Sequence, residues 1–109
     1  MRYVFLNSIA LNMFQKPFFK LLVTKVRHDV LKQLVSMMKD IECYIRHKAT
    51  VELLSKELGL NLQPSSDLYK YREGDVLLVV SLKKPIRGKE LENISLDDLD
   101  IWMVEVMTG

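Results

Sequence analysis

The feature that most restricts the fold is an unbroken apolar run, VLLVVSL, at Val76–Leu82. Its β-branched residues favour a strand, and the lack of polar alternation indicates that both faces of this strand are buried. Such a strand needs neighbouring strands at its edges and other elements over its faces. We therefore expect Val76–Leu82 at the centre of a sheet.

Four further segments are expected as strands, because they are rich in β-branched and aromatic residues or alternate in polarity. They are Tyr3–Ile9, Phe18–Val26, Leu68–Arg72 and Ile101–Met107. Glu73 and Gly74 are typical of a tight turn, which predicts a hairpin between Leu68–Arg72 and Val76–Leu82. Residues 61–67 combine Asn, Pro, Ser and Asp and are expected to form a loop.

Two longer segments have helical periodicity. Apolar residues recur at helical spacing over residues 28–42, with lysine and aspartate among the intervening positions. A second helix is expected over Lys48–Leu58, and the glycine that follows it is typical of a left-handed C-terminal cap. Ser95 and Asp98 have the spacing of a capping box, which predicts a short helical turn over Leu96–Leu99.

The expected order is strand, strand, helix, helix, strand, strand, short helix, strand, without strict alternation. This mixture is typical of an α/β protein of the α+β type. We expect a single domain over residues 1–109, with a mixed sheet of about five strands flanked by two main helices and a short third helix. A chain of 109 residues is long enough to bury a core without metals or disulfides. The order of the strands stays open.

The formal net charge of +2 conceals a strong asymmetry along the chain. Residues 1–48 carry nine basic and three acidic side chains, and residues 83–89 carry four basic and none acidic. Residues 90–109 carry six acidic side chains and no basic one. This distribution predicts an anionic partner on one face. The alternative is that the basic and acidic ends pair with each other or are simply solvated.

Several classes of protein are not expected. No apolar run approaches the roughly 18 residues of a membrane span, so we expect no membrane partner. Cys43 is the single cysteine and cannot form an internal disulfide, which favours a reducing, cytoplasmic location. The sequence contains no Walker loop, dinucleotide glycine fingerprint, paired histidine motif or nucleophile elbow. Neither a metal site nor a cofactor is expected.

His47 is the first candidate for a functional residue. It lies between Arg46 and Lys48, where the second helix is expected to begin. Unpaired N–H groups at a helix start favour a bound phosphate, and an imidazole beside a phosphate can act as a general acid or base. Thr50, one helical turn further on, can add a hydroxyl to the same site. The alternative is a surface histidine at a helix start and a threonine that makes only a backbone contact.

A basic loop after the central strand is the second candidate. Its cations can fold over an anionic ligand, or the loop is only solvated. They are Lys83, Lys84, Arg87 and Lys89. Asn7 and Asn12 flank the end of the first expected strand. Their amides can contact a base or a phosphate, or they can form turns.

Several of these segments together resemble a known family. They are Leu11–Met13, Ile45–Thr50, Gly59–Pro64, and the basic residue and Gly88–Lys89 that follow Val76–Leu82. In this order they are similar to the small ring nucleases that archaeal viruses and some bacterial mobile elements use as type III anti-CRISPR proteins. The resemblance extends from Tyr3 to Val106, over nearly the whole chain.

The resemblance implies a homodimer with a mixed sheet that binds cyclic tetra-adenylate across its two-fold axis. It implies cleavage without metal to di-adenylates with a cyclic 2′,3′-phosphate. His47 falls on the family's catalytic histidine, which protonates the departing 5′-oxygen. Lys84 falls on a basic position that stabilises charge on the scissile phosphate, where other members usually have arginine, and Arg87 is close enough to replace it. Ala10 and Ala49 stand where some members have serine.

Two other functions stay open. The basic N-terminal half is also typical of a non-enzymatic dimer that binds DNA or RNA through its backbone, even if weakly. A family member that binds the cyclic nucleotide without cutting it is the third reading.

Overall fold

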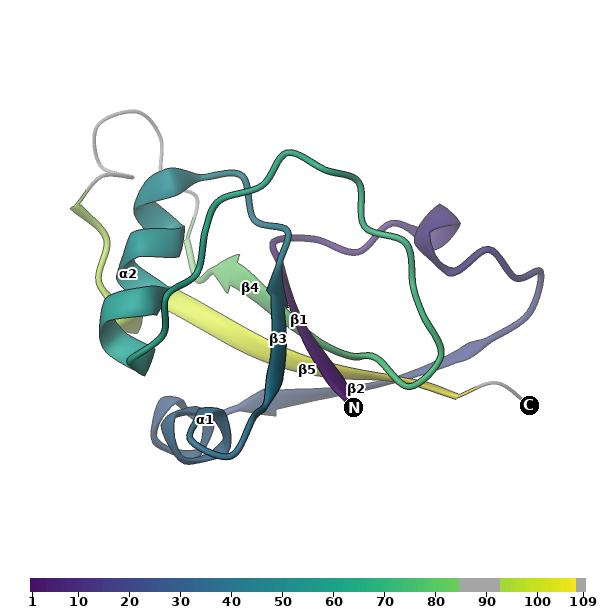
Figure 1. Cartoon of the computed structure of the whole chain (residues 1–109), viewed down its shortest axis with the longest axis horizontal. Helices are drawn as coiled ribbons and strands as arrows, with labels where there is room; N and C mark the ends of the chain where they lie inside the picture. Colours follow the sequence, from purple (N-terminus) through teal and green to yellow (C-terminus); the bar gives the residue numbers. More distant parts are fainter. Residues whose placement is uncertain (85–92, 108–109) are drawn as a thin grey trace.

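The computed structural model describes residues 1–84 and 93–107 and contains one five-stranded sheet. The strands are β1 (Arg2–Leu6), β2 (Lys20–Val26), β3 (Asp40–Cys43), β4 (Val76–Leu82) and β5 (Leu99–Met107). Their order across the sheet is β2-β5-β4-β1-β3 (Figure 1). β1 pairs parallel with β3 and β4, and β5 pairs antiparallel with β4 and β2. The expected mixed sheet is confirmed, and β4 is its central strand.

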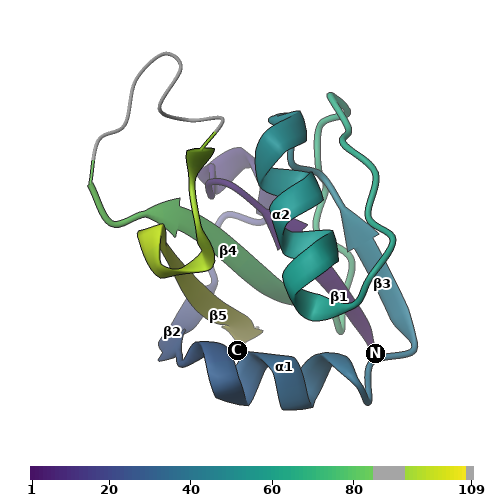
Figure 2. The same cartoon turned by 90° about the vertical axis from the view of Figure 1, so that its left-hand side faces the viewer.

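One face of the sheet carries the helices. α1 (His28–Val35) and α2 (Lys48–Leu58) lie on the same side of the strands, together with the 3-10 turn η3 (Leu96–Asp98) (Figure 2). Their apolar residues form a single cluster with the inward side chains of β1, β4 and β5. Leu31 of α1 and Leu54 of α2 are completely buried there. The helical face therefore provides the larger of two hydrophobic clusters.

The opposite face has no α-helix among the described residues. It is covered by the 3-10 turn η1 (Leu11–Phe14) and by the long segment between α2 and β4 (Figure 1). Phe14 and Tyr69 are buried against Val4, Leu6 and Leu77 of the sheet. Aromatic side chains thus replace a helix as the cover of this face.

The expected helix over residues 28–42 is wrong beyond Val35. Residues 40–43 form β3 at the edge of the sheet, where Ile41 and Cys43 are half-buried and Asp40 and Glu42 are exposed. Ile41 continued the helical spacing by coincidence, because an apolar residue there also fits a two-residue period. The free edge of β1 decides the outcome, since its backbone groups need partners that only an extended segment can supply.

The expected strand over Leu68–Arg72 is also wrong. The alternation exists, with Tyr69 buried and Leu68 exposed, but these residues form no ladder with a neighbouring strand. Gly74 does form the expected tight turn, at φ 92°. The sheet has five strands as predicted only because β3 takes the place of this segment.

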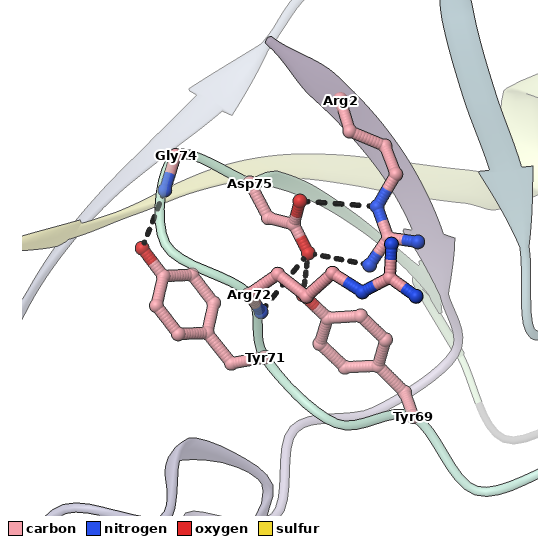
Figure 3. A network of polar contacts seen from close by, with 6 residues as sticks. All are labelled: Arg2, Tyr69, Tyr71, Arg72, Gly74 and Asp75. Atoms are coloured by element: carbon pink, nitrogen blue, oxygen red, sulfur yellow. Dashed lines mark hydrogen bonds and ion pairs between the residues drawn. The ribbon is translucent and has the colours of Figure 1, made fainter.

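A buried polar network anchors the end of this segment instead (Figure 3). Asp75, which is 5% exposed, accepts hydrogen bonds from Arg2 at 3.0 and 2.8 Å and from the Tyr69 hydroxyl at 2.5 Å. The Arg72 backbone N–H adds a fourth, at 3.2 Å. Burial alone would raise the pKa of the Asp75 carboxyl, but the hydrogen bonds from Arg2 and Tyr69 hold it below its ordinary value. The network ties the strand-like segment to the start of β1.

Other local predictions are confirmed with small shifts of boundary. α2 has the expected bounds, and Gly59 follows it at φ 67° as a left-handed cap. Ser95 donates its backbone N–H to the Asp98 carboxylate at 2.9 Å, as the capping box requires. β1 ends at Leu6 rather than at residue 9, and β2 begins at Lys20. Within residues 1–84 and 93–107, no helix has the length and apolar character needed to cross a bilayer.

Candidate functional site

A pocket of about 360 Å³ lies where the parallel strands β1, β3 and β4 end. Each wall comes from a different element: the residue after β1, the segment between β3 and α2, the first turn of α2, the end of β4 and the start of β5. The lining residues are Asn7, Ile45, His47, Thr50, Val80, Ser81, Leu82 and Leu99. The carboxyl ends of parallel strands are the usual place for ligands in open α/β sheets.

His47 lines this pocket and is the residue at which α2 begins. It is the N-cap residue, with extended backbone at φ −72° and ψ 110°, and its side chain is half-buried. The imidazole Nδ1 accepts the backbone N–H of Thr50 at 3.2 Å and lies 2.9 Å from the Thr50 hydroxyl oxygen. The imidazole thus does what a serine or aspartate side chain does at most helix starts. The predicted histidine at a helix start is confirmed.

The capping hydrogen bond determines which nitrogen of the neutral imidazole carries the proton. Because Nδ1 accepts a backbone N–H, its lone pair is in use and the ring proton lies on Nε2. Nε2 makes no hydrogen bond to another residue within the described ranges. The nitrogen left for a ligand in the pocket is therefore a donor in the neutral ring.

The rest of the pocket combines an apolar floor with a few polar groups. Ile45, Val80 and Leu99 are at most 4% exposed and form the floor. Asn7 is exposed at the end of β1, so its amide can reach a ligand. Ser81 also lines the pocket, but its hydroxyl accepts a hydrogen bond from the Trp102 indole N–H at 3.3 Å on the helix-free face of the sheet. This arrangement suits a ligand with both a flat apolar part and polar edges.

Ser81 is a lining residue that the sequence analysis missed. A signal was present, because it has the only hydroxyl in the apolar run Val76–Leu82. A polar side chain near the end of a buried strand stands where the sheet edge opens to solvent. Trp102, whose indole N–H donates to Ser81, lies directly across from Val79 on β4.

The structure brings three of the candidate residues together and places others elsewhere. Asn7, His47 and Thr50 line the pocket, and Arg46 and Lys48 are exposed on either side of His47. Lys48 pairs with Glu52 one turn further along α2, at 3.8 Å.

Lys83 and Lys84 follow β4 directly and are exposed, but neither lines this pocket. The backbone N–H of Lys83 donates to the Asp98 carbonyl at 2.9 Å, which fixes where the basic segment leaves the sheet. Arg87 and Lys89 lie outside the described residues. Asn12 is exposed in η1, away from the pocket lining.

The other reactive groups are engaged in structure. His28 begins α1, and its Nε2 lies 2.9 Å from the Leu99 carbonyl oxygen, to which it donates. Burial raises the pKa of the Cys43 thiol, which makes it a poor nucleophile. In the described part of the chain, no three His, Cys, Asp or Glu side chains gather closely enough to hold a metal ion.

Both the sequence and the fold match known proteins. The model of a family described as STIV B116-like matches residues 3–105. The solved structure of B116 of Sulfolobus turreted icosahedral virus superposes with a TM-score of 0.76 at 16% sequence identity. The match covers 95% of this chain and 98% of that protein, and at this identity it shows a shared fold. No curated protein has a significantly similar sequence.

Proposed function

The chain belongs to the STIV B116-like family, and we propose that it is a metal-independent ring nuclease that cleaves cyclic tetra-adenylate. The observation that carries the proposal is the position of His47. It caps the N-terminus of α2 and lines a pocket at the carboxyl ends of three parallel strands. Backbone N–H groups of a helix start attract phosphate, and the exposed Lys48 adds positive charge beside it.

The proposed reaction needs only groups of the chain and of the substrate. The ribose 2′-oxygen attacks the adjacent phosphorus, the bond from phosphorus to the 5′-oxygen breaks, and the product keeps a cyclic 2′,3′-phosphate. The protonated imidazole of His47 gives its Nε2 proton to the departing 5′-oxygen, and the 2′-hydroxyl proton passes to water. Lys84, or Arg87 in its place, would balance the charge that grows on the phosphate.

A homodimer is part of the proposal. A pocket of about 360 Å³ is at the lower end of small-molecule sites, so one chain encloses only part of a ring of four nucleotides. A two-fold symmetric ligand suits a dimer that presents each residue twice.

The helix-free face of the sheet supports such an interface. Val23 of the edge strand is 51% exposed there, and it pairs with Val104 beside the half-buried Trp102. Trp102 is in turn hydrogen-bonded to Ser81 of the pocket. A second copy seated on this face would give the dimer two such pockets.

The test is to incubate the protein with cyclic tetra-adenylate in EDTA and to follow the products by chromatography. His47→Asn is the sharpest variant, because asparagine still caps a helix but cannot supply the proton. We expect its cleavage rate to fall by roughly 10²–10⁴-fold at unchanged thermal stability. His28→Asn is the matched control, since His28 also begins a helix but lies outside the pocket.

Two results would overturn the proposal. The first is a wild-type protein that leaves the ring intact. The second is a His47→Asn variant that cuts as fast as wild type. Tight binding of a DNA or RNA duplex without ring cleavage would favour the nucleic-acid-binding alternative, and such binding would weaken steeply with salt.

A further inference from the structure

We infer that Thr50 is a positioning residue for His47: the Thr50 backbone N–H holds the imidazole Nδ1 when this nitrogen is bare, and the Thr50 hydroxyl oxygen holds it when it is protonated. The inference rests on the proposed function, because it concerns how His47 acts as an acid. It starts from a conflict between the two tasks of His47, which are to cap α2 and to deliver a proton.

The capping task needs a bare Nδ1. In this state the nitrogen accepts the Thr50 backbone N–H at 3.2 Å, and the single ring proton lies on Nε2. A neutral imidazole is far too weak an acid to give up that remaining proton. The acid must therefore be the imidazolium, which carries a proton on both nitrogens.

The acid task needs a protonated Nδ1, which then faces the backbone N–H, another donor. The Thr50 hydroxyl resolves this conflict, because its oxygen lies 2.9 Å from Nδ1 and can either donate or accept. When Nδ1 is bare it accepts the Thr50 backbone N–H, and when Nδ1 is protonated it donates a hydrogen bond to the Thr50 hydroxyl oxygen. The ring keeps its position in both states.

The same acceptor serves during the reaction. When Nε2 gives its proton to the 5′-oxygen, the ring is left neutral with its proton on Nδ1, which is the opposite tautomer from the capped resting state. The Thr50 hydroxyl oxygen can accept a hydrogen bond from the protonated Nδ1 until the ring exchanges protons with water. A carboxylate or a carbonyl usually orients such a histidine, and here a hydroxyl takes that place.

Among the described residues, Nδ1 makes hydrogen bonds with Thr50 alone. On the same segment, Arg46 and Lys48 are cations and donate only, and Glu52 is paired with Lys48 at 3.8 Å. The facing walls from β1, β4 and β5 contribute Asn7, Ser81 and apolar residues, none of which titrates. Thr50 is thus the acceptor that the described structure offers to a protonated Nδ1.

Thr50→Val and Thr50→Ser test this inference, since valine keeps the shape and serine keeps the hydroxyl. We expect Thr50→Val to lower the single-turnover cleavage rate by roughly tenfold, the value of about one hydrogen bond to a charged group. The alkaline limb of its pH–rate profile, where the protonated acid is lost, should lie at lower pH than in wild type, with KM little changed. Thr50→Ser should restore both the rate and the profile.

A second measurement does not depend on cleavage. Nitrogen-15 NMR of the imidazole in the nucleotide-free protein should show a bare Nδ1 in wild type when the ring is neutral. In acid, it should show a hydrogen-bonded Nδ1 proton in wild type and in Thr50→Ser. In Thr50→Val that proton should lack its acceptor and exchange faster with water.

The inference is wrong if Thr50→Val matches wild type in pH profile and in the Nδ1 signals, or if Thr50→Ser fails to restore them. A wild-type protein whose acidic Nδ1 proton has no acceptor also overturns it, even where Thr50→Val does not fold. If wild type leaves the ring intact, the proposed function fails, while the NMR signals still decide whether Thr50 holds the ring.

Discussion

Replacing Asp75 with asparagine removes the charge at the centre of the buried network. The carboxylate side chain is 3% exposed and the Arg2 side chain that it pairs with is 11% exposed. Asparagine presents an amide N–H₂ toward donors that now need an acceptor, so the guanidinium is left without its counter-charge. Breaking a buried pair from one side typically costs about 3–5 kcal/mol of unfolding free energy.

Urea unfolding followed by circular dichroism measures this change. At a typical slope for a small domain, the midpoint of Asp75→Asn should fall by roughly 2 M with the slope itself unchanged. The cost is a large part of the stability of a domain this size, which is about 5–15 kcal/mol. Far-ultraviolet spectra at zero urea should match wild type, because the hydrophobic clusters on both faces remain.

Asp29→Asn is the matched control. The Arg27–Asp29 pair has the same two-bond geometry, at 3.2 and 2.9 Å, but both side chains are more than two-thirds exposed. Solvent screens such a pair, so this variant should shift the urea midpoint by only a small fraction of the change in Asp75→Asn. Equal shifts in the two variants would refute the argument that burial gives the Asp75 network its strength.

The same network predicts a dependence on pH. The pKa of Asp75 is lower in the folded chain than its ordinary value of 3.8, because the hydrogen bonds from Arg2 and Tyr69 outweigh the effect of burial. Its stabilising contribution is therefore fully present above pH 3.8 and is lost as the pH falls through the lower folded pKa. Between pH 6 and pH 3, wild type should lose more unfolding free energy than Asp75→Asn.

Two further predictions concern the ends of α2. Gly59→Ala should lower the unfolding free energy by about 1 kcal/mol, because φ of 67° strains any residue with a Cβ although no atom lies within 4 Å of the new methyl group. Gly59→Asn should cost less in the same urea unfolding assay, and equal losses would contradict the backbone explanation. His47→Ala should lower stability by about 1 kcal/mol through loss of the cap, whereas His47→Asn should not. Equal stability of these two variants would show that the imidazole cap contributes nothing.

The position of the pocket follows from the topology. β1 pairs with β3 on one edge and β4 on the other, both parallel, so three strands end on the same side of the sheet. The chain leaves β3 through Ile45 and enters α2 at His47, which lies over this end. Residues that are distant along the chain meet there, since Asn7 and His47 are 40 positions apart and His47 and Ser81 are 34 apart.

The sequence by itself determined the elements whose signals are local. β4 needs only its unbroken apolar run, and α2 needs its apolar stripe and Gly59 at the left-handed cap. The imidazole of His47 and the hydroxyl of Thr50 meet because N3 lies three positions after the N-cap in any helix. The candidate histidine was therefore recognisable before any tertiary contact was known.

Only the tertiary structure decided which ambiguous segments became strands. Residues 40–43 fit a helical and an extended pattern equally, and the open edge of β1 selected the strand. Residues 68–72 alternate in polarity as a strand does. A hairpin would need a free edge of β4, but β1 occupies one edge and β5 the other. The pocket is decided in the same way, because strand order brings Asn7, His47 and Ser81 together. Backbone pairing is a competition between distant segments, and a local pattern does not contain the competitor.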